Sequence, residues 1–135
     1  MSDLNAYWFL QRAASQMENA NAELNRPSED IVTMSVCQLS KDIIADLLRA
    51  FLLLHGEMTV KADNLETLRS ACATIEPKFN SLNFRSMSCH PTTLNEDKHY
   101  CLDHMNVFRC MGIADRVKIL VDESFRKKEK KQQSR

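Results

Sequence analysis

The sequence predicts an all-α fold, an up-and-down antiparallel four-helix bundle with a short third helix. Three observations predict it. The chain has 135 residues, which suits one domain with its own core. It contains only two glycines and three prolines, so it has few of the residues that β-turns require. Apolar residues also recur at steps of three or four along most of its length. We therefore expect one helical domain over residues 1–126 and a basic, disordered tail over residues 127–135.

The first predicted helix covers residues 3–25 and is followed by a break at "NRPSED". Its apolar stripe consists of Tyr7, Leu10, Ala14, Met17, Ala20 and Leu24. After the break, Pro27 or Ser28 suits the start of a second helix, because acidic residues follow where the helix dipole is positive. The two helices are expected to form a tight hairpin.

The second predicted helix has the clearest pattern. Its stripe consists of Val32, Val36, Leu39, Ile43, Leu47, Ala50 and Leu54, and it ends at Gly56, a residue type that commonly caps helix C-termini. Beyond Ile43 a second face is also apolar, through Ile44, Leu48, Phe51 and Leu52. This pattern indicates either the central helix of the bundle or a helix shared with another subunit.

The third and fourth predicted helices are separated by the longest expected loop. Asp63 and Glu66 have the spacing of a capping box and open a short helix that must end near Pro77. Residues 77–92 show no helical stripe and are expected to form the loop. The same capping-box spacing recurs at Thr93 and Glu96, which open the last helix.

Charge and cysteine content limit the function classes. The formal net charge is zero, and the six basic residues between 126 and 135 face only Glu129 as an acid, so the body of the chain is acidic. No signal peptide or membrane span is expected, since no long apolar run lacks charged residues. Five cysteines at irregular spacing predict reduced thiols and a cytoplasmic location. No phosphate-binding glycine loop occurs, and no cofactor is expected.

Two segments resemble a known family. "AYWFLQRAASQMENANAEL" is similar to the opening helix of HEPN domains, and "CQLSKDIIADLLRAFLLLHGEMTVKADNLETL" resembles their second helix and the start of the third. The resemblance covers about residues 4–126. Two positions depart from the family pattern: Gln38 is followed by "LSKDII" where many members have Glu-Lys, and Asp63 stands where a histidine is usual.

The resemblance implies a cytoplasmic homodimer that binds a nucleotide or RNA. It also implies two more specific roles, as the helical partner of a nucleotidyltransferase or as a component of a toxin–antitoxin pair. Ribonuclease members of the family carry an arginine followed four to six residues later by a histidine, and Arg85 with His90 fits that spacing. In that role His90 takes the 2′-hydroxyl proton and Arg85 holds the phosphate, which makes the chain a metal-independent endoribonuclease.

Two alternatives to ribonuclease chemistry remain open for this part of the chain. In the first, Arg85 and His90 are ordinary polar residues of a loop. In the second, a structural zinc site forms from Cys89, His90, Cys101 and His104, since Cys101 and His104 lie three residues apart and can share a helix face.

A third possibility is a non-enzymatic protein-interaction module. Large apolar residues exceed the needs of one narrow core stripe, and some are expected to line a dimer interface or a partner groove: Trp8, Phe9, Phe51, Leu52 and Phe108. His55, at the end of the second helix, is expected to interact with the terminal carbonyls and to take no part in catalysis.

Overall fold

The structure is a computed structural model, and it describes residues 2–25, 33–57, 64–84 and 104–133. These residues form four α-helices and one 3₁₀ helix: α1 (Ser2–Leu24), α2 (Thr33–Leu54), α3 (Leu65–Ile75), η2 (Pro77–Ser81) and α4 (His104–Gln133). No strand occurs within those ranges. The prediction of an all-α fold is confirmed for this part of the chain.

The first two helices end where the sequence predicts. The first predicted helix, residues 3–25, differs from α1 by one residue at each end. The α2 helix ends at Leu54, and Gly56 follows with a φ of 82°, in the left-handed region that glycine adopts without a steric penalty. The Gly56 N–H donates to the Leu53 carbonyl at 3.0 Å and the Glu57 N–H to the Leu52 carbonyl at 2.9 Å. Pro27 and Ser28, the predicted start of α2, lie outside the described residues.

The cap of α3 is not the predicted one. Asn64 is the N-cap, and its side-chain oxygen accepts the Thr67 N–H at 2.8 Å. Asp63 lies outside the described residues. Glu66 is exposed and forms an ion pair with Arg69. An asparagine three residues before the bonded N–H serves as the cap as well as an aspartate does, so the error is one residue of register.

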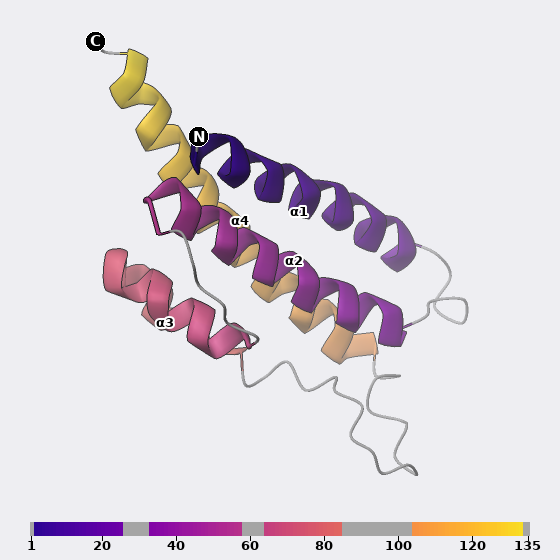
Figure 1. Cartoon of the computed structure of the whole chain (residues 1–135). Coiled ribbons are helices and arrows are strands. Elements are labelled where there is room, and N and C mark those ends of the chain that lie inside the picture. The colour runs from indigo at the N-terminus through magenta and orange to yellow at the C-terminus, as the bar shows by residue number, and fades with distance from the viewer. Residues whose placement is uncertain (1, 26–32, 58–63, 85–103, 134–135) are drawn as a thin grey trace.

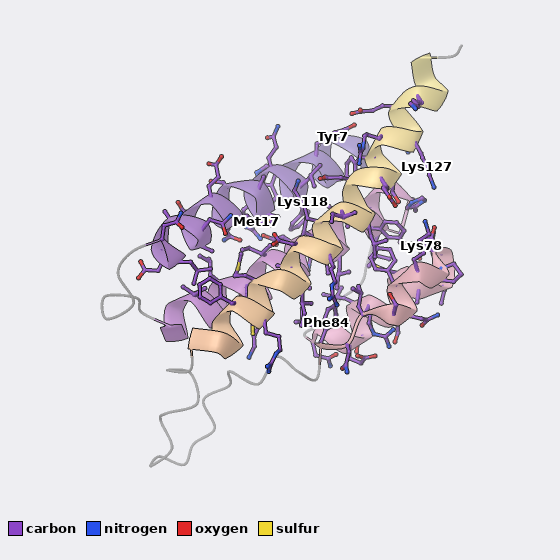
Figure 2. The ribbon with its side chains drawn as sticks, turned by 180° about the vertical axis from the view of Figure 1, so that it is seen from behind. Tyr7, Met17, Lys78, Phe84, Lys118 and Lys127 are labelled. Carbon is purple, nitrogen blue, oxygen red and sulfur yellow. The ribbon has the colours of Figure 1, made fainter. Side chains whose placement is uncertain are left out.

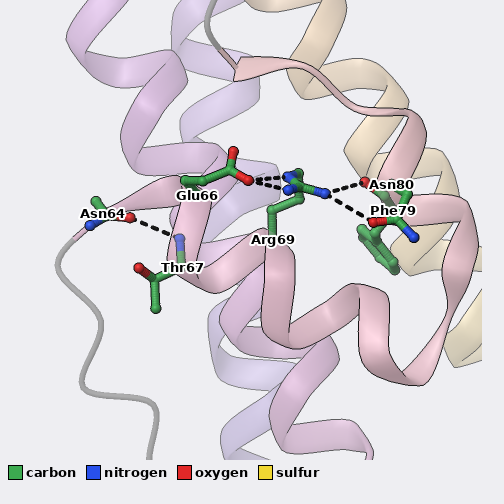
Figure 3. A network of polar contacts seen from close by, with 6 residues as sticks. All are labelled: Asn64, Glu66, Thr67, Arg69, Phe79 and Asn80. Carbon is green, nitrogen blue, oxygen red and sulfur yellow. Dashed lines mark hydrogen bonds and ion pairs between the residues drawn. The ribbon is translucent and has the colours of Figure 1, made fainter.

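The start of the predicted loop is a 3₁₀ helix. Residues 77–81 form η2, because Pro77 fixes a helical φ at its first position and the Glu76 carboxylate accepts the Lys78 N–H at 3.1 Å. Figure 3 shows how this helix is attached to α3. The Arg69 guanidinium donates to the Phe79 carbonyl at 3.4 Å and to the Asn80 side-chain oxygen at 3.3 Å, while its other edge binds Glu66.

The last helix is longer at its C-terminal end than predicted. The predicted start at Thr93 lies outside the described residues. Residues 127–133, which were expected to belong to a disordered tail, continue α4 in the structure. Two contacts explain this difference: the Tyr7 hydroxyl donates to the Glu129 carboxylate at 2.7 Å, and the Lys128 ammonium donates to the Leu54 carbonyl at 3.0 Å.

Helix α2 is the centre of the bundle. Helix α1 packs on one flank, α3 on the other, and α4 lies behind it (Figure 1). On the widened apolar part of α2, the following residues are at most 3 % exposed: Ile43, Ile44, Leu47, Leu48, Ala50, Phe51, Leu52 and Leu54. Both apolar faces of α2 are therefore buried within one chain, as the central-helix alternative predicted.

The helices do not alternate strictly in direction. Figure 1 shows α1 running opposite to α2, while α4 runs in the same direction as α2. Helix α3 also runs in the same direction as α2, since the Cys72 thiol lies 3.6 Å from the Leu48 carbonyl and Ile75 lies near Leu54. The up-and-down order predicted for four helices thus does not hold at α3. The segment between Gly56 and Asn64 can span about 25 Å when extended, which exceeds the roughly 16 Å length of an 11-residue helix.

One buried charge interrupts the core. Asp46 on α2 is 2 % exposed, and it accepts two hydrogen bonds of 2.8 Å from Nε and Nη2 of Arg12 on α1. Arg49 lies 3.8 Å from the same carboxylate. The Arg12 guanidinium also lies 4.5 Å from the centre of the Trp8 ring. This bidentate pair satisfies the carboxylate and fixes the register between α1 and α2.

The cysteines differ from one another. Cys72 and Cys110 are buried thiols, as predicted, and burial raises the pKa of Cys72 to about 12. Cys37 is disulfide-bonded, so the prediction of reduced thiols is wrong at this position. A side chain 1 % exposed at the start of α2 is as well placed for a disulfide as for a buried thiol, and sequence spacing does not distinguish the two.

Candidate functional site

Most of the residues predicted to form a site lie outside the described ranges. This is true of Arg85, His90, Cys89 and Cys101, while His104 begins α4 without a described side chain. The structure therefore places neither the predicted ribonuclease pair nor the predicted zinc site. Among the described residues, no group of three or more His, Cys, Asp or Glu side chains is arranged to hold a metal ion.

The large apolar residues predicted to line an interface fall into two groups. Phe51 and Leu52 are at most 2 % exposed and belong to the core, so they do not line an interface, and the partly buried Phe9 packs against the same core. Phe51 and Leu52 are buried because α2 is the central helix, which packs against neighbours on two faces. Trp8 on α1 and Phe108 on α4 remain 54 % and 53 % exposed, respectively.

A pocket of about 750 Å³ lies at the end of the bundle where the C-terminal ends of α2 and α3 meet the last turns of α4. Its apolar floor is formed by Phe51, Leu54 and Ile75, and its rim carries Lys127, Lys128 and Lys130. We call it the lysine-rimmed pocket. Figure 2 shows Lys127 on this part of α4.

The floor of the lysine-rimmed pocket is an aromatic and aliphatic surface. Phe51 is buried, and the His55 ring packs against it with a centroid distance of 4.5 Å and an interplanar angle of 49°. Phe79 also packs against Phe51, at a centroid distance of 4.7 Å. Ile75 is 37 % exposed at the edge. Such a floor suits a flat, apolar group of a ligand.

The rim is strongly positive. Lys127 and Lys130 are exposed, and neither forms an ion pair with a described residue. Lys128 is held in place by its bond to the Leu54 carbonyl. The single acid that lines the pocket, Glu76, already accepts the Lys78 N–H as the cap of η2. The rim therefore attracts an anionic group.

His55 adds no positive charge to the rim at neutral pH. Burial lowers the pKa of His55, and the nearby Lys128 ammonium lowers it further, while Glu76 acts in the opposite direction. Its expected interaction with the terminal carbonyls of α2 is replaced by that of Lys128, whose longer side chain reaches the Leu54 oxygen from α4. The imidazole instead extends the aromatic surface of the floor.

The lysines of the rim were missed at the level of the sequence because residues 127–135 were assigned to a tail. A signal was available: Val117, Val121 and Phe125 recur at steps of four, and the next step reaches Glu129 within the basic segment. Continuing the helix places those lysines beside the end of α2. Of the floor residues, Phe51 and Leu54 were predicted as part of the apolar faces of the second helix, and His55 as the end of that helix.

No protein-family model, curated protein or solved structure matches this chain. The HEPN resemblance accordingly stays a prediction from the sequence. None of the helices in the described ranges combines the length and apolarity needed to cross a membrane.

Proposed function

We propose that this chain binds a nucleotide in the lysine-rimmed pocket, with the base on the apolar floor and the phosphates at the lysines. The observation that carries the proposal is the combination, in one pocket, of the His55 ring, which packs on the buried Phe51 ring, with the rim of Lys127, Lys128 and Lys130. A nucleotide has this same division into a flat ring and an anionic end.

Size and charge support the proposal. A volume of about 750 Å³ is within the range of roughly 300–1,000 Å³ that small-molecule sites occupy. Lysine is a common phosphate ligand because its ammonium group acts as a compact, mobile point charge. The neutral state of His55 favours stacking of a base, since it removes the cost of desolvating a charged ring.

The HEPN resemblance adds finer proposals that agree with nucleotide binding. They are an HEPN-like bundle, a cytoplasmic homodimer, and partnership with a nucleotidyltransferase or membership of a toxin–antitoxin pair. Ribonuclease activity through Arg85 and His90 belongs to the same set. For that activity, substitution of either residue by alanine should abolish cleavage of an RNA substrate with little change in stability. Cleavage that persists in both variants would assign it to other residues.

A protein-interaction module is the second candidate function. Trp8, Phe108 and Ile119 favour it, since each is more than half exposed. These residues lie on α1 and on α4, and none of the three lines the lysine-rimmed pocket. Alanine substitutions at Trp8 and Phe108 should then weaken binding of a partner protein and leave nucleotide binding unchanged.

The main test is calorimetric titration with ADP and with adenosine. We expect ADP to bind more tightly than adenosine, and its affinity to fall as salt is raised, because the exposed lysines are screened. The double variant Lys127→Gln/Lys130→Gln should weaken ADP binding at least tenfold and leave adenosine binding unchanged.

Lys118→Gln provides a matched control. Lys118 lies on the same helix, outside the pocket, and pairs with Asp122 at 2.7 Å. If the two variants weaken ADP binding equally, the effect comes from overall charge, and the pocket is not the site. If ADP does not bind the unmodified chain at millimolar concentration, nucleotide binding itself is excluded.

A further inference from the structure

A second pocket, of about 360 Å³, lies between α4 and the end of η2. One wall is formed by residues 81–83, and the other by Arg109, Gly112, Ile113 and Arg116 of α4. We call it the arginine groove. Gly112 is 15 residues before Lys127, which corresponds to roughly 22 Å along the helix. The arginine groove is therefore separate from the lysine-rimmed pocket. An ion pair of 3.9 Å between Lys78 and Glu123 joins η2 to α4 near the lysine-rimmed pocket.

The helix register brings the two arginines to one face. Gly112 is three residues after Arg109 and four residues before Arg116, so all three share a side of α4. The two guanidinium groups therefore flank the position that has no side chain. Both arginines are exposed, while Ile113 is 6 % exposed and forms part of the base of the groove.

Neither arginine has an acidic partner within the described ranges. None of the residues three or four positions from them along the described part of α4 is acidic, so no pair like that of Lys118 and Asp122 can form. No residue that lines the groove is acidic. Asp115 is adjacent to Arg116 in sequence but is rotated by about 100° around the helix. Two positive charges thus face one small concave surface, and no acidic side chain of the described residues pairs with either.

Gly112 is not required by packing. A Cβ built there would meet no heavy atom within 4 Å. Glycine inside a helix costs about 1 kcal/mol relative to alanine, so the residue lowers stability without relieving a clash. What glycine does provide is an open space between the two guanidinium groups.

We propose that the arginine groove binds the phosphate group of a small phosphorylated molecule, held by Arg109 and Arg116 over Gly112. Each guanidinium presents a planar set of N–H donors that matches the oxygens of a phosphate. A phosphate monoester carries a charge of about −1.5 to −2 at neutral pH, which balances two arginines where a single carboxylate does not. This second site is independent of the nucleotide proposed for the lysine-rimmed pocket.

The probe is inorganic phosphate, titrated into isotope-labelled full-length protein while the chemical shifts of the protein are followed by NMR. A titration with chloride at the same ionic strength is the control. We expect chemical-shift changes at residues 81–83 and 109–116. The double variant Arg109→Gln/Arg116→Gln should raise the dissociation constant for phosphate, as measured from these shifts, at least tenfold. Arg126→Gln, an exposed arginine of the same helix outside the groove, should not weaken it.

Gly112→Leu tests the open space directly. Its side chain should fill the groove and abolish the phosphate-dependent shifts, while helix propensity predicts unchanged or higher thermal stability. Gly112→Ala serves if the leucine variant does not fold, and it should weaken phosphate binding while raising the melting temperature. A variant that gains stability and loses binding separates this site from a merely structural role.

Several results would overturn the proposal. One is phosphate binding that persists at residues 109–116 in both the arginine and the glycine variants. Another is the absence of any shift beyond that caused by chloride. Shifts confined to residues 124–130 and removed by Lys127→Gln/Lys130→Gln would place phosphate in the lysine-rimmed pocket alone. That result would support the proposed function and reject the second site.

Discussion

Helices α2 and α4 show two ways in which a long helix can be placed in a small bundle. The 22 residues of α2 are covered by α1, α3 and α4, and beyond Ile43 the helix is apolar on both faces. The 30 residues of α4 are covered on one side, where Ala114, Val117 and Val121 are buried. Both candidate pockets take their basic residues from α4. The covered helix sets the fold, and the half-covered helix is free to carry binding groups.

The largest expected effect tests the burial of α2. Phe51→Ala should lower the free energy of unfolding by about 3–5 kcal/mol, because it opens a cavity at a fully buried ring in contact with Phe79. Ile119→Ala on the exposed side of α4, where the side chain is 58 % exposed, should change it by less than about 0.5 kcal/mol. Urea denaturation measures both. Similar losses in the two variants would mean that α4 is covered in solution by a further surface.

The next effect concerns the charged exception within α2. Arg12→Ala removes two hydrogen bonds from the buried Asp46 carboxylate and should cost about 1.5–3 kcal/mol, the usual contribution of a hydrogen-bonded charged group. Asp46→Asn in the Arg12→Ala background should recover part of the loss, since an amide is less costly to bury than a carboxylate. A double-mutant cycle measures the coupling. Zero coupling energy would show that Arg49 alone satisfies Asp46.

A smaller effect tests the attachment of the last turns of α4. Tyr7→Phe keeps the ring, which packs edge-on against Phe125 at a centroid distance of 4.9 Å, and removes the hydroxyl that binds Glu129. The expected loss is about 0.5–1 kcal/mol. Hydrogen exchange of the backbone amides of residues 126–130 should become faster, by the factor that corresponds to a similar loss of free energy. Unchanged exchange would show that other contacts hold this part of the helix.

The smallest expected effect is a pH dependence of the free energy of unfolding, caused by His55 where the end of α2 meets α4. The pKa of His55 is lowered in the folded chain, so below its unfolded value of about 6.5 the unfolded state binds more protons. Stability from His55 is therefore fully present above that pH and declines as the pH falls through the lower folded-state pKa. His55→Gln should reduce the difference in unfolding free energy between pH 7.5 and pH 5.5. An identical difference in the variant would show that His55 does not titrate in this range.

The fold was predictable where burial constrains the sequence. The stripe from Val36 to Leu54 and the glycine after it identify α2 and its end, because a helix covered on two faces must be apolar on both. The direction of α3 was not predictable, since apolar spacing shows which face is buried but not which way the helix runs. The cap at Asn64 was missed by one residue, because Asp63 and Asn64 are both good caps.

The candidate sites were less predictable for a physical reason. Lysines and arginines on an exposed helix face are compatible with any function or with none, so Arg109, Arg116 and Lys127 carry no pattern of their own. Whether such residues form a binding site depends on the elements packed opposite them, which here are η2 and the ends of α2 and α3. The residues that did show a pattern, Arg85 and His90, fall outside the described part of the chain.

The contact between Lys128 and Leu54 joins residues 74 positions apart, and that between Tyr7 and Glu129 joins residues 122 apart. During synthesis, the hairpin of α1 and α2 is complete long before α4 leaves the ribosome. One apolar side of α2 must then stay open to solvent until α4 has been made. Non-local contacts of this kind slow folding, and an exposed apolar helix favours aggregation. Nascent chains that stop before α4 should therefore be the forms that require chaperones.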